Sequence, residues 1–176
     1  AMKVVTDVVE GGGSVYVAPD SPQIVTPAEG NKVAGGVHTR SFDAALPQED
    51  RLYHHKIHRV LAYARANHLN RIGGAGEGAQ IGIVSAGKAW QDVQQAFASL
   101  GLDEARLQAL GIRTLKMGLV WPIEAEVVRS FARGLSTIVV VEEKRPLLED
   151  QIRAVLYGTE QAPAIIGKHA DGHYLS

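Results

Sequence analysis

Two carboxylates and two cations follow one another at residues 142–145, EEKR, directly after a run of apolar β-branched residues. Glutamates at such a point could act as a general acid and a general base. Neighbouring residues of a strand point to opposite faces, however, so only one of Glu142 and Glu143 can face a given site. Two interpretations of the EEKR cluster therefore stay open: contact with another domain beside an active site, and capping of the helix that follows.

Lys88 belongs to residues 82–89, GIVSAGKA, which match the GxxxxGK pattern of phosphate-binding loops. Such a loop requires Ser or Thr after the lysine to hold Mg²⁺, whereas this sequence has Ala89. Gly82 also lies inside an apparent strand. We therefore predict no nucleotide hydrolysis, and we interpret Gly87 as the residue that lets the chain turn tightly off that strand.

Two further patterns suggest sites that we do not predict. His54 and His58 have a spacing that can bind a metal, but the acidic residue of an HExxH motif is missing because residue 55 is His. A solvated helix face is the better interpretation. The glycines between residues 73 and 82 precede a strand instead of following one, so they do not form a dinucleotide-binding motif. We expect a flexible joint there, and we predict neither a metal site nor a nucleotide site.

The elements that must position these side chains alternate between strand and helix from residue 80 onward. We predict strands at residues 81–85, 112–120, 137–143 and 163–167. Amphipathic helices separate them, one of them capped by Asp103 and ended near Gly111. Alternation at this interval is typical of crossover units with a mainly parallel sheet. The predicted fold class is α/β with three layers, and the charged residues lie at the carboxyl ends of the strands.

Residues 1–79 have a different character from residues 80–176, which form the predicted α/β core. Apolar patches within residues 2–17 predict a short hairpin or two edge strands. Residues 18–48 show little periodicity and are interpreted as an extended arm. Residues 48–67 predict an amphipathic helix that packs on the core. Its apolar stripe consists of Tyr53, Ile57, Val60, Leu61 and Ala64.

The composition excludes several classes of function. With 18 basic and 19 acidic residues the net charge is −1, which gives no electrostatic reason to expect nucleic acid or an anionic membrane as a partner. No apolar run is long enough to span a membrane, and the first residues lack the apolar core of a signal peptide. The absence of cysteine excludes a disulfide, a cysteine nucleophile and a cysteine-bound iron–sulfur cluster in this chain. We expect a cytoplasmic location.

Three stretches of the sequence resemble an internal portion of indolepyruvate ferredoxin oxidoreductases, which are thiamine-diphosphate-dependent 2-oxoacid:ferredoxin oxidoreductases. They are IGIVSAGKAWQDVQQAFASLGLD, LGIRTLKMGLVWPIEAEVVRSFARGL and VVVEEKRPLLEDQIRAVLYG. GGVHTR, ARANHLNRI and PAIIGK upstream and downstream also look like this family. The resemblance implies a transketolase C-terminal-domain-like α/β/α sandwich of about five mostly parallel strands with one antiparallel strand. The patches within residues 2–17 could supply that strand.

The same resemblance implies what the complete enzyme does. It would convert indolepyruvate and other arylpyruvates, with coenzyme A as cosubstrate, to the aryl-acetyl-CoA, CO₂ and reduced ferredoxin. Thiamine diphosphate with Mg²⁺ and [4Fe–4S] clusters would carry that chemistry. The partners implied are the thiamine-binding and iron–sulfur domains, ferredoxin and, in a dimer, a second copy. The equivalent domain of another thiamine-dependent 2-oxoacid oxidoreductase is an alternative.

Several parts that such an enzyme needs have no counterpart in this sequence. Residues 170–173, ADGH, lack the leading glycine of the GDG motif that binds the diphosphate and Mg²⁺. We therefore expect the chain to be one domain of a longer polypeptide, to bind no cofactor and to be inactive alone. The residues that we expect to approach the active site or another domain are Lys88, Trp121, Glu142, Glu143, Lys144 and Arg145. A small-anion-binding module that uses Lys88, Lys144 and Arg145 as donors is the alternative function.

Overall fold

The computed structural model describes residues 14, 16–18, 23–27, 36–170 and 173–174. Its centre is a five-stranded sheet with the strand order β1-β3-β2-β4-β5. The strands are β1 (Arg71–Gly74), β2 (Ile81–Ala86), β3 (Ile112–Met117), β4 (Thr137–Val141) and β5 (Ala164–Ile166). β1 runs antiparallel to β3, and the other neighbouring strands are parallel. The predicted α/β fold with one antiparallel strand is confirmed.

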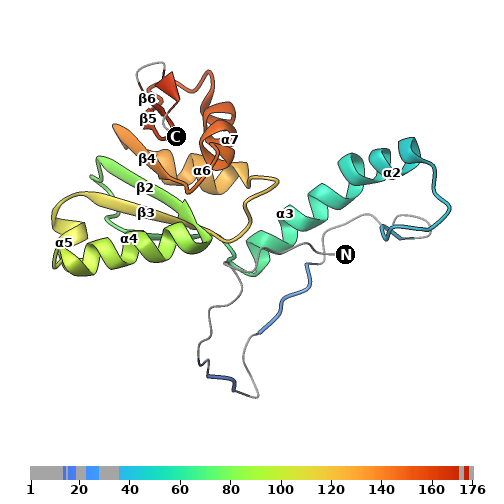
Figure 1. The fold of residues 1–176 in the computed structure, drawn as a ribbon, viewed down its shortest axis with the longest axis horizontal. Helices are drawn as coiled ribbons and strands as arrows, with labels where there is room; N and C mark the ends of the chain where they lie inside the picture. Colours follow the sequence, from blue (N-terminus) through green and yellow to red (C-terminus); the bar gives the residue numbers. More distant parts are fainter. Residues whose placement is uncertain (1–13, 15, 19–22, 28–35, 171–172, 175–176) are drawn as a thin grey trace.

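Helices cover both faces of this sheet (Figure 1). They are α4 (Gly87–Ser99), α5 (Glu104–Ala109), α6 (Ala125–Ala132) and α7 (Leu147–Leu156). α4 and α5 lie on one face, over a small apolar cluster around Val93, Phe97 and Leu107. α6 and α7 lie on the other face. The predicted three layers are therefore present, and a sheet that is covered on both faces explains the uninterrupted apolar run in β4.

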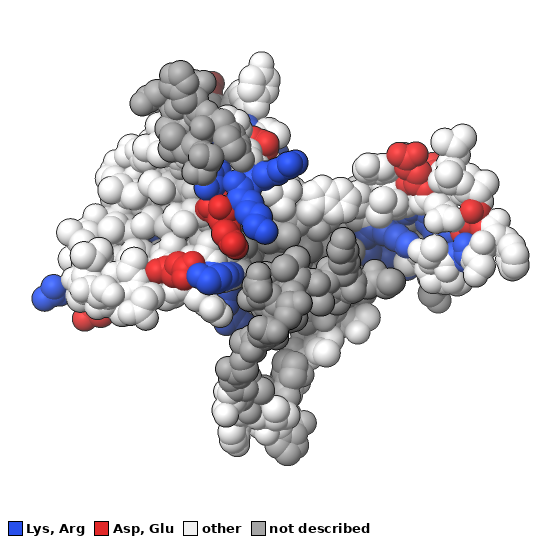
Figure 2. Space-filling model, viewed as in Figure 1, with Lys and Arg blue, Asp and Glu red and all other residues white. Residues whose placement is uncertain are grey.

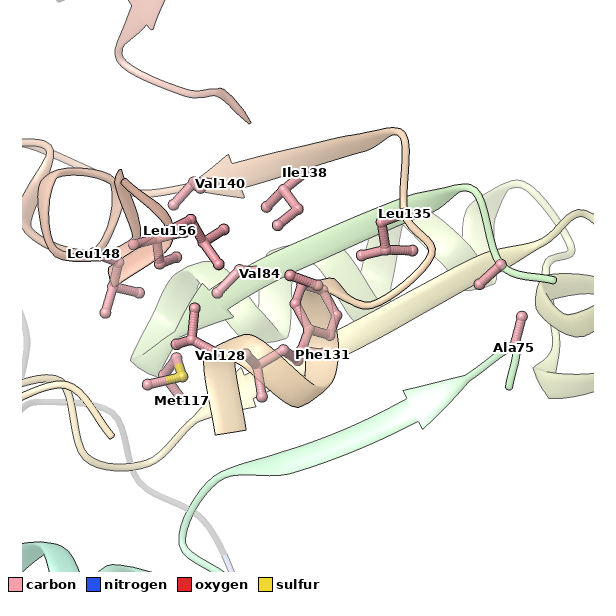
Figure 3. Close-up of a cluster of buried hydrophobic side chains, with 14 residues drawn as sticks. Ala75, Val84, Met117, Val128, Phe131, Leu135, Ile138, Val140, Leu148 and Leu156 are labelled. Carbon is pink, nitrogen blue, oxygen red and sulfur yellow. The ribbon is translucent and has the colours of Figure 1, made fainter. Parts of the chain in front are cut away.

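The larger core lies between the sheet and the pair α6 and α7 (Figure 3). Val84 of β2 and Ile138 of β4 have no exposed surface. Phe131 of α6, which packs in the same core, is 1% exposed. Each fully buried side chain of this size stabilises the fold by about 1.5–3 kcal/mol. The two central strands and α6 therefore form the part of the fold that fixes the position of the carboxyl ends of the strands.

Arg113 is a buried cation at the start of β3 and lies at the opposite, amino-terminal edge of the parallel strands. Its guanidinium donates to the carbonyl oxygens of Ala75 (3.0 Å), Phe131 (2.7 Å) and Arg133 (2.9 Å), and also to that of Gly76. The side chain thus joins the β1–β2 loop to the C-terminal end of α6, where helix carbonyls lack intrahelical donors. It holds together two segments that share no strand pairing.

The antiparallel strand comes from a different part of the chain than predicted. It is β1, which includes Gly73 and Gly74, so the flexible joint predicted for the glycines is wrong in this part. Residues 71–74 therefore belong to the sheet. The hairpin predicted within residues 2–17 lies almost wholly outside the described residues. Backbone pairing needs no side-chain pattern, and this is why a glycine-rich strand escapes periodicity.

Three of the predicted strands are too long, and one of them is β5, which spans Ala164–Ile166 instead of residues 163–167. β3 ends at Met117 instead of residue 120, because the amides of Gly118 and Leu119 donate to the side chain of Asn70 at 3.0 Å each. β4 ends at Val141 instead of residue 143. Beyond it the chain turns, and Glu142 is used by the next helix, as described below. Two short strands, β6 (His169–Ala170) and β7 (His173–Tyr174), pair with each other after β5.

The predicted N-terminal helix is present as one rod made of α2 (Ala45–Arg51), a π-helical turn η1 (Leu52–Lys56) and α3 (Ile57–Ala66). The rod projects away from the sheet (Figure 1), and the end of α3 joins it to the core. Its buried residues are Ala62 and Ala64, whereas Tyr53 and Val60 of the predicted stripe are 52% and 41% exposed. That this helix packs on the core stays a prediction for the rest of its length. Only the small residues near the end of α3 are buried.

Candidate functional site

The candidate site is the edge of the sheet at which β2, β3 and β4 end, called here the carboxyl edge. Because these strands are parallel, their last residues Ala86, Met117 and Val141 are neighbours. β2 runs directly into the N-terminal end of α4, whereas β3 and β4 are each followed by a loop and then by α6 or α7. In open α/β sheets ligands and partners bind at this edge. All six residues singled out in the sequence, Lys88, Trp121 and the EEKR cluster, follow these strands and therefore belong to this edge.

Glu142 serves as a capping residue for α7. Its carboxylate accepts hydrogen bonds from the backbone amides of Leu148 at 2.7 Å and Glu149 at 3.1 Å. These are amides of the first turn, which have no partner inside the helix. Of the two interpretations left open by the sequence, capping is thus what the geometry shows for Glu142. Its neighbour Glu143 is exposed.

Replacing Glu142 by alanine is expected to lower the free energy of unfolding by about 1–2 kcal/mol, because two amides at the start of α7 lose their acceptor. Chemical denaturation of the purified variant measures this loss. The matched control is Glu143→Ala, at an exposed neighbour, with an expected change of no more than about 0.5 kcal/mol. Equal effects of the two substitutions would contradict the capping role.

Lys88 is the second residue of α4, and its charge is already paired. The Nζ atom lies 2.8 Å from both carboxylate oxygens of Asp92, one turn further along the helix. This hydrogen bond and the charge of Asp92, with a smaller contribution from Glu143, raise the pKa of Lys88 above its ordinary value. Both side chains are mainly exposed, at 69% and 61%, so the pair contributes little to stability. Figure 2 shows this edge as a region of mixed charge.

Gly82, the first glycine of the GxxxxGK pattern, has a packing role in β2. A Cβ atom at this position would lie 2.5 Å from Leu135 Cδ1 and 2.6 Å from Phe131 Cζ. Real Cβ atoms do not approach other atoms this closely, so glycine is required for α6 to pack against the sheet. The first glycine of the match to a phosphate-binding loop is therefore explained by packing.

The substitution Gly82→Ala should accordingly destabilise the fold by about 1–3 kcal/mol through overpacking. The expected result is a lower midpoint in urea with an unchanged slope of the transition. Gly76→Ala is the matched control, because a Cβ atom at Gly76 meets no atom within 4 Å. An unchanged midpoint for Gly82→Ala would contradict the packing role.

Trp121 lies in the loop between β3 and α6 and is 48% exposed, next to Val120 at 38%. Gln151 of α7 holds this loop. Its amide nitrogen donates to the carbonyl oxygens of Val120 and Leu147, and its oxygen accepts from the amide of Ile123, at distances of 2.8–3.0 Å. Leu147 is itself 48% exposed. The loop and the start of α7 thus present apolar surface in a fixed arrangement beside the EEKR cluster.

Glu124 connects the carboxyl edge to the N-terminal rod. Its carboxylate accepts from the amide of Val127 at 2.7 Å, which caps α6, and from Arg65 of α3 at 2.8 Å. The glutamate side chain is 4% exposed. The sequence analysis missed this residue, as it missed Gln151 and Asn70. The one available signal was the position of Glu124, three residues before Val127 at the start of a helical pattern.

Glu149 is a fully buried carboxylate on α7. One oxygen accepts from Nε and Nη2 of Arg153 at 3.0 and 2.7 Å, and the other accepts from the amides of Lys168 at 2.6 Å and His169 at 3.2 Å. Burial raises the pKa of Glu149, but the hydrogen bonds from Arg153 and the two amides outweigh it and hold the pKa below its ordinary value. The residue fastens the segment after β5 to α7.

The histidines of the rod do not form a metal site with other described residues. His54 lies 2.9 Å from a carboxylate oxygen of Asp50, one turn away on an exposed surface. In the described part of the chain no three His, Asp or Glu side chains come together in a way that could hold a metal ion. None of the described helices is long and apolar enough to cross a membrane.

One cavity in the described part of the chain lies away from the carboxyl edge. It has a volume of about 780 Å³ and lies at the opposite edge of the sheet, between the end of α6 and the loop before β5. Leu135, Leu156 and Pro163 form its apolar floor, and Arg129 and Arg133 lie on its wall. The carboxyl ends of helices point to this side and disfavour anions there. The carboxyl edge, and not this cavity, is therefore the candidate site.

Two solved structures resemble this chain at low scores. One is a split-gene transketolase in the form of an inactive β4 tetramer, with a TM-score of 0.43, 20% identity and coverage of 60% of this chain and 34% of that chain. The other is a 2-oxoglutarate:ferredoxin oxidoreductase from Magnetococcus marinus with 2-oxoglutarate, coenzyme A and succinyl-CoA bound. Its TM-score is 0.47 and its identity 16%, over 90% of this chain and 26% of that chain.

Sequence relatives are more informative. The indolepyruvate oxidoreductase subunit IorA of Methanothermobacter thermautotrophicus is 32% identical over 114 residues, or 62% of this chain and 17% of that protein. The subunit of the same name from Thermococcus kodakarensis is 28% identical over 134 residues, or 74% of this chain and 19% of that protein. The chain thus spans less than a fifth of either relative. The family model described as "Indolepyruvate oxidoreductase domain" matches residues 71–175, the whole sheet from β1 to β5, and the chain therefore belongs to this domain family.

Proposed function

We propose that this chain is the structural, interdomain part of an indolepyruvate:ferredoxin oxidoreductase and that it does no chemistry by itself. The observation that carries this proposal is the use of the carboxylates at the carboxyl edge. Glu142 caps α7, and Glu124 caps α6 and pairs with Arg65. Groups that hold helix ends are not available as a proton donor and acceptor. The edge supplies position and contact surface.

The activity of the complete enzyme would be the oxidative decarboxylation of arylpyruvates. The bond between the carboxylate and the carbonyl carbon breaks and releases CO₂. The acyl carbon is oxidised and joined to the sulfur of coenzyme A, and the electrons pass to ferredoxin. Thiamine diphosphate, Mg²⁺ and [4Fe–4S] clusters supply this chemistry when they are bound in other domains. We also propose a dimeric enzyme with a cytoplasmic location.

The residues of this chain do not fit those cofactors. Without cysteine the chain offers no thiolate for an iron–sulfur cluster. The carboxylates at the carboxyl edge do not gather into a metal-binding group among the described residues. We therefore derive no catalytic step in this chain.

The surface that meets the neighbouring domains would be the apolar and charged part of the carboxyl edge. Trp121 and Leu147 are each 48% exposed and are held in place through Gln151. Glu143 and Arg145 are exposed beside them. Aromatic and arginine side chains of this kind are typical centres of protein interfaces. This assignment gives roles to the candidate residues that are not used as caps.

The test compares the native gene product with this chain. The native product is expected to be a much longer polypeptide that reduces ferredoxin in the presence of indolepyruvate and coenzyme A. This chain alone is expected to show no such activity when thiamine diphosphate and Mg²⁺ are added. Turnover by the isolated chain, or a native mass equal to that of this chain, would contradict the proposal.

A small-anion-binding module is the alternative, and the pairing of Lys88 with Asp92 counts against it. The two hypotheses differ in thermal unfolding. A ligand at 100 times its Kd adds about 2.7 kcal/mol of stability, which raises the melting temperature measurably. We expect no shift with phosphate, coenzyme A or thiamine diphosphate. A saturable shift that is lost in Lys88→Ala would favour the binding module instead.

A further inference from the structure

The rod formed by α2, η1 and α3 has only two buried residues, Ala62 and Ala64. It extends to roughly 30 Å at 1.5 Å per residue and leaves the core at the end of α3 (Figure 1). A single helix of this length has little stability of its own in water, because most helical stability in proteins comes from packing of an apolar face. The rod therefore needs a surface to pack against.

The rod has a partly exposed apolar stripe. Leu46, Tyr53 and Val60 recur at intervals of seven residues and are 77%, 52% and 41% exposed, and Tyr63 follows at 38%. Large apolar side chains with this spacing are typical of helices that pack against another element. Two of the four are tyrosines, which combine apolar area with a hydroxyl group that seeks a hydrogen-bond partner at the rim of an interface.

Side-chain contacts hold the start of the rod in place. Arg51 forms an ion pair with Asp43 and donates to the carbonyl oxygen of His38 at 3.3 Å, and the two side chains of the pair are 13% and 16% exposed. Lys56 donates to Thr39 at 3.2 Å. These contacts fasten the loop of residues 36–44 along the rod. The π-helical turn η1 begins directly after Arg51 and includes Lys56. Turns of this kind are rare in proteins, and those that occur are often found at functional sites.

The contact between the rod and the core limits where a partner that packs on the rod can lie. Arg65, near the end of α3, is bound to Glu124, and Glu124 caps α6 at the carboxyl edge. A body that packs against the end of α3 therefore lies beside this edge. The charged groups of the edge and the rod are visible together in Figure 2.

We propose that the rod is a docking strut that seats a neighbouring domain of the same polypeptide, and this rests on the proposed function. The Thermococcus kodakarensis match is longer than the stretch from residue 71 to the end of the chain, so it includes part of the rod. That relative is more than five times as long as the matched segment, which covers 19% of it. The neighbouring domain presents an apolar groove for Leu46, Tyr53 and Val60, with hydrogen-bond acceptors at its rim for the tyrosine hydroxyls.

The experiment compares hydrogen exchange of residues 45–60 in the native-length enzyme and in this 176-residue chain. In the native-length enzyme the amides should exchange on the order of 100-fold more slowly, because docking suppresses local opening of the helix. The double variant Leu46→Glu with Tyr53→Glu should abolish this protection. Leu100→Glu with Tyr157→Glu is the matched control, at positions that are 69% and 91% exposed outside the rod, and it should leave the protection unchanged.

Three results would overturn the proposal in distinguishable ways. Equal exchange in both proteins, with an active native-length enzyme, removes the strut but leaves the proposed function intact. Protection in the isolated chain that rises with protein concentration, together with a dimer in sedimentation equilibrium, assigns the stripe to a second copy. A native product no longer than this chain is recognised from its mass before any exchange is measured, and it removes the proposed function as well.

Discussion

The variant Glu149→Gln is expected to lose about 3 kcal/mol of unfolding free energy, a large share of the stability of a typical domain. In the native protein both carboxylate oxygens are acceptors, one for Arg153 and the other for the amides of Lys168 and His169. Glutamine has one oxygen and one NH₂ group. Whichever way its amide is turned, one set of donors meets another donor inside a buried site. Urea denaturation at neutral pH measures the loss.

The acid sensitivity of the protein should change in the same variant. The pKa of Glu149 in the folded protein lies below its ordinary value of 4.5. The ionised carboxylate therefore stabilises the fold above about pH 4.5, and this contribution is lost as the pH falls through the folded-state pKa. The unfolding free energy of the wild type should fall more steeply below pH 4.5 than that of Glu149→Gln. Parallel pH profiles would show that Glu149 does not carry this dependence.

Glu126→Gln is the control for Glu149→Gln, because Glu126 also pairs with an arginine of its own helix but is 72% exposed. Its effect should stay within about 0.5 kcal/mol. A second substitution tests the same site from the other side. A Cβ atom at Gly167 would collide with the Glu149 carboxylate, so Gly167→Ala should also destabilise the protein. A stable Gly167→Ala protein would contradict the close packing described here.

The variant Arg113→Met should cost about 3–5 kcal/mol, the largest effect expected in this domain. Methionine fills the space but leaves the carbonyl oxygens of Ala75, Gly76, Phe131 and Arg133 without their donor. A buried group without a partner costs about 1–3 kcal/mol, and some of these oxygens can recover by reaching water. Thermal or chemical unfolding of the variant measures the sum.

Arg113→Lys separates the charge from the geometry at this site. Lysine keeps the cation but lacks the planar fork that reaches several carbonyls at once, so it should restore only part of the lost stability. The matched control is Arg133→Met, because Arg133 is exposed and its side chain donates to Ser130. Its effect should be within about 0.5 kcal/mol. Full stability of Arg113→Met would mean that the four hydrogen bonds contribute nothing net.

The strands and helices of the core could be predicted because their patterns are local. The alternation of apolar strand and amphipathic helix indicated β2, β3, β4 and β5, with errors of a few residues at the ends. Asp103 was correctly identified as a cap, since its side chain accepts from the amide of Arg106 at 2.8 Å. Caps act within one turn of the chain, so the sequence contains all the information they need.

The missed features depend on partners that are distant in sequence. β1 pairs through its backbone with a strand some forty residues later, and its glycines carry no pattern. Arg113 and Glu149 resemble surface charges in the sequence, because only the folded chain brings four carbonyls to one and two amides to the other. The carboxyl edge was predicted from the alternation of strands and helices, whereas the assignment of Glu142 as a cap required the turn after β4. The roles of Lys88, Trp121, Glu143, Lys144 and Arg145 stay predictions.

The strand order also has a consequence for synthesis on the ribosome. β2 is the central strand of the five-stranded sheet and the first of the parallel strands in the chain. Both of its partners, β3 and β4, are synthesised after it. β1 also waits for β3. A nascent chain that ends before β3 therefore carries two strands without any partner in the sheet, one of them apolar. Such unpaired strands invite wrong pairing with other chains. Premature termination between residues 100 and 110 should thus give insoluble products, whereas chains that include β4 can close the centre of the sheet.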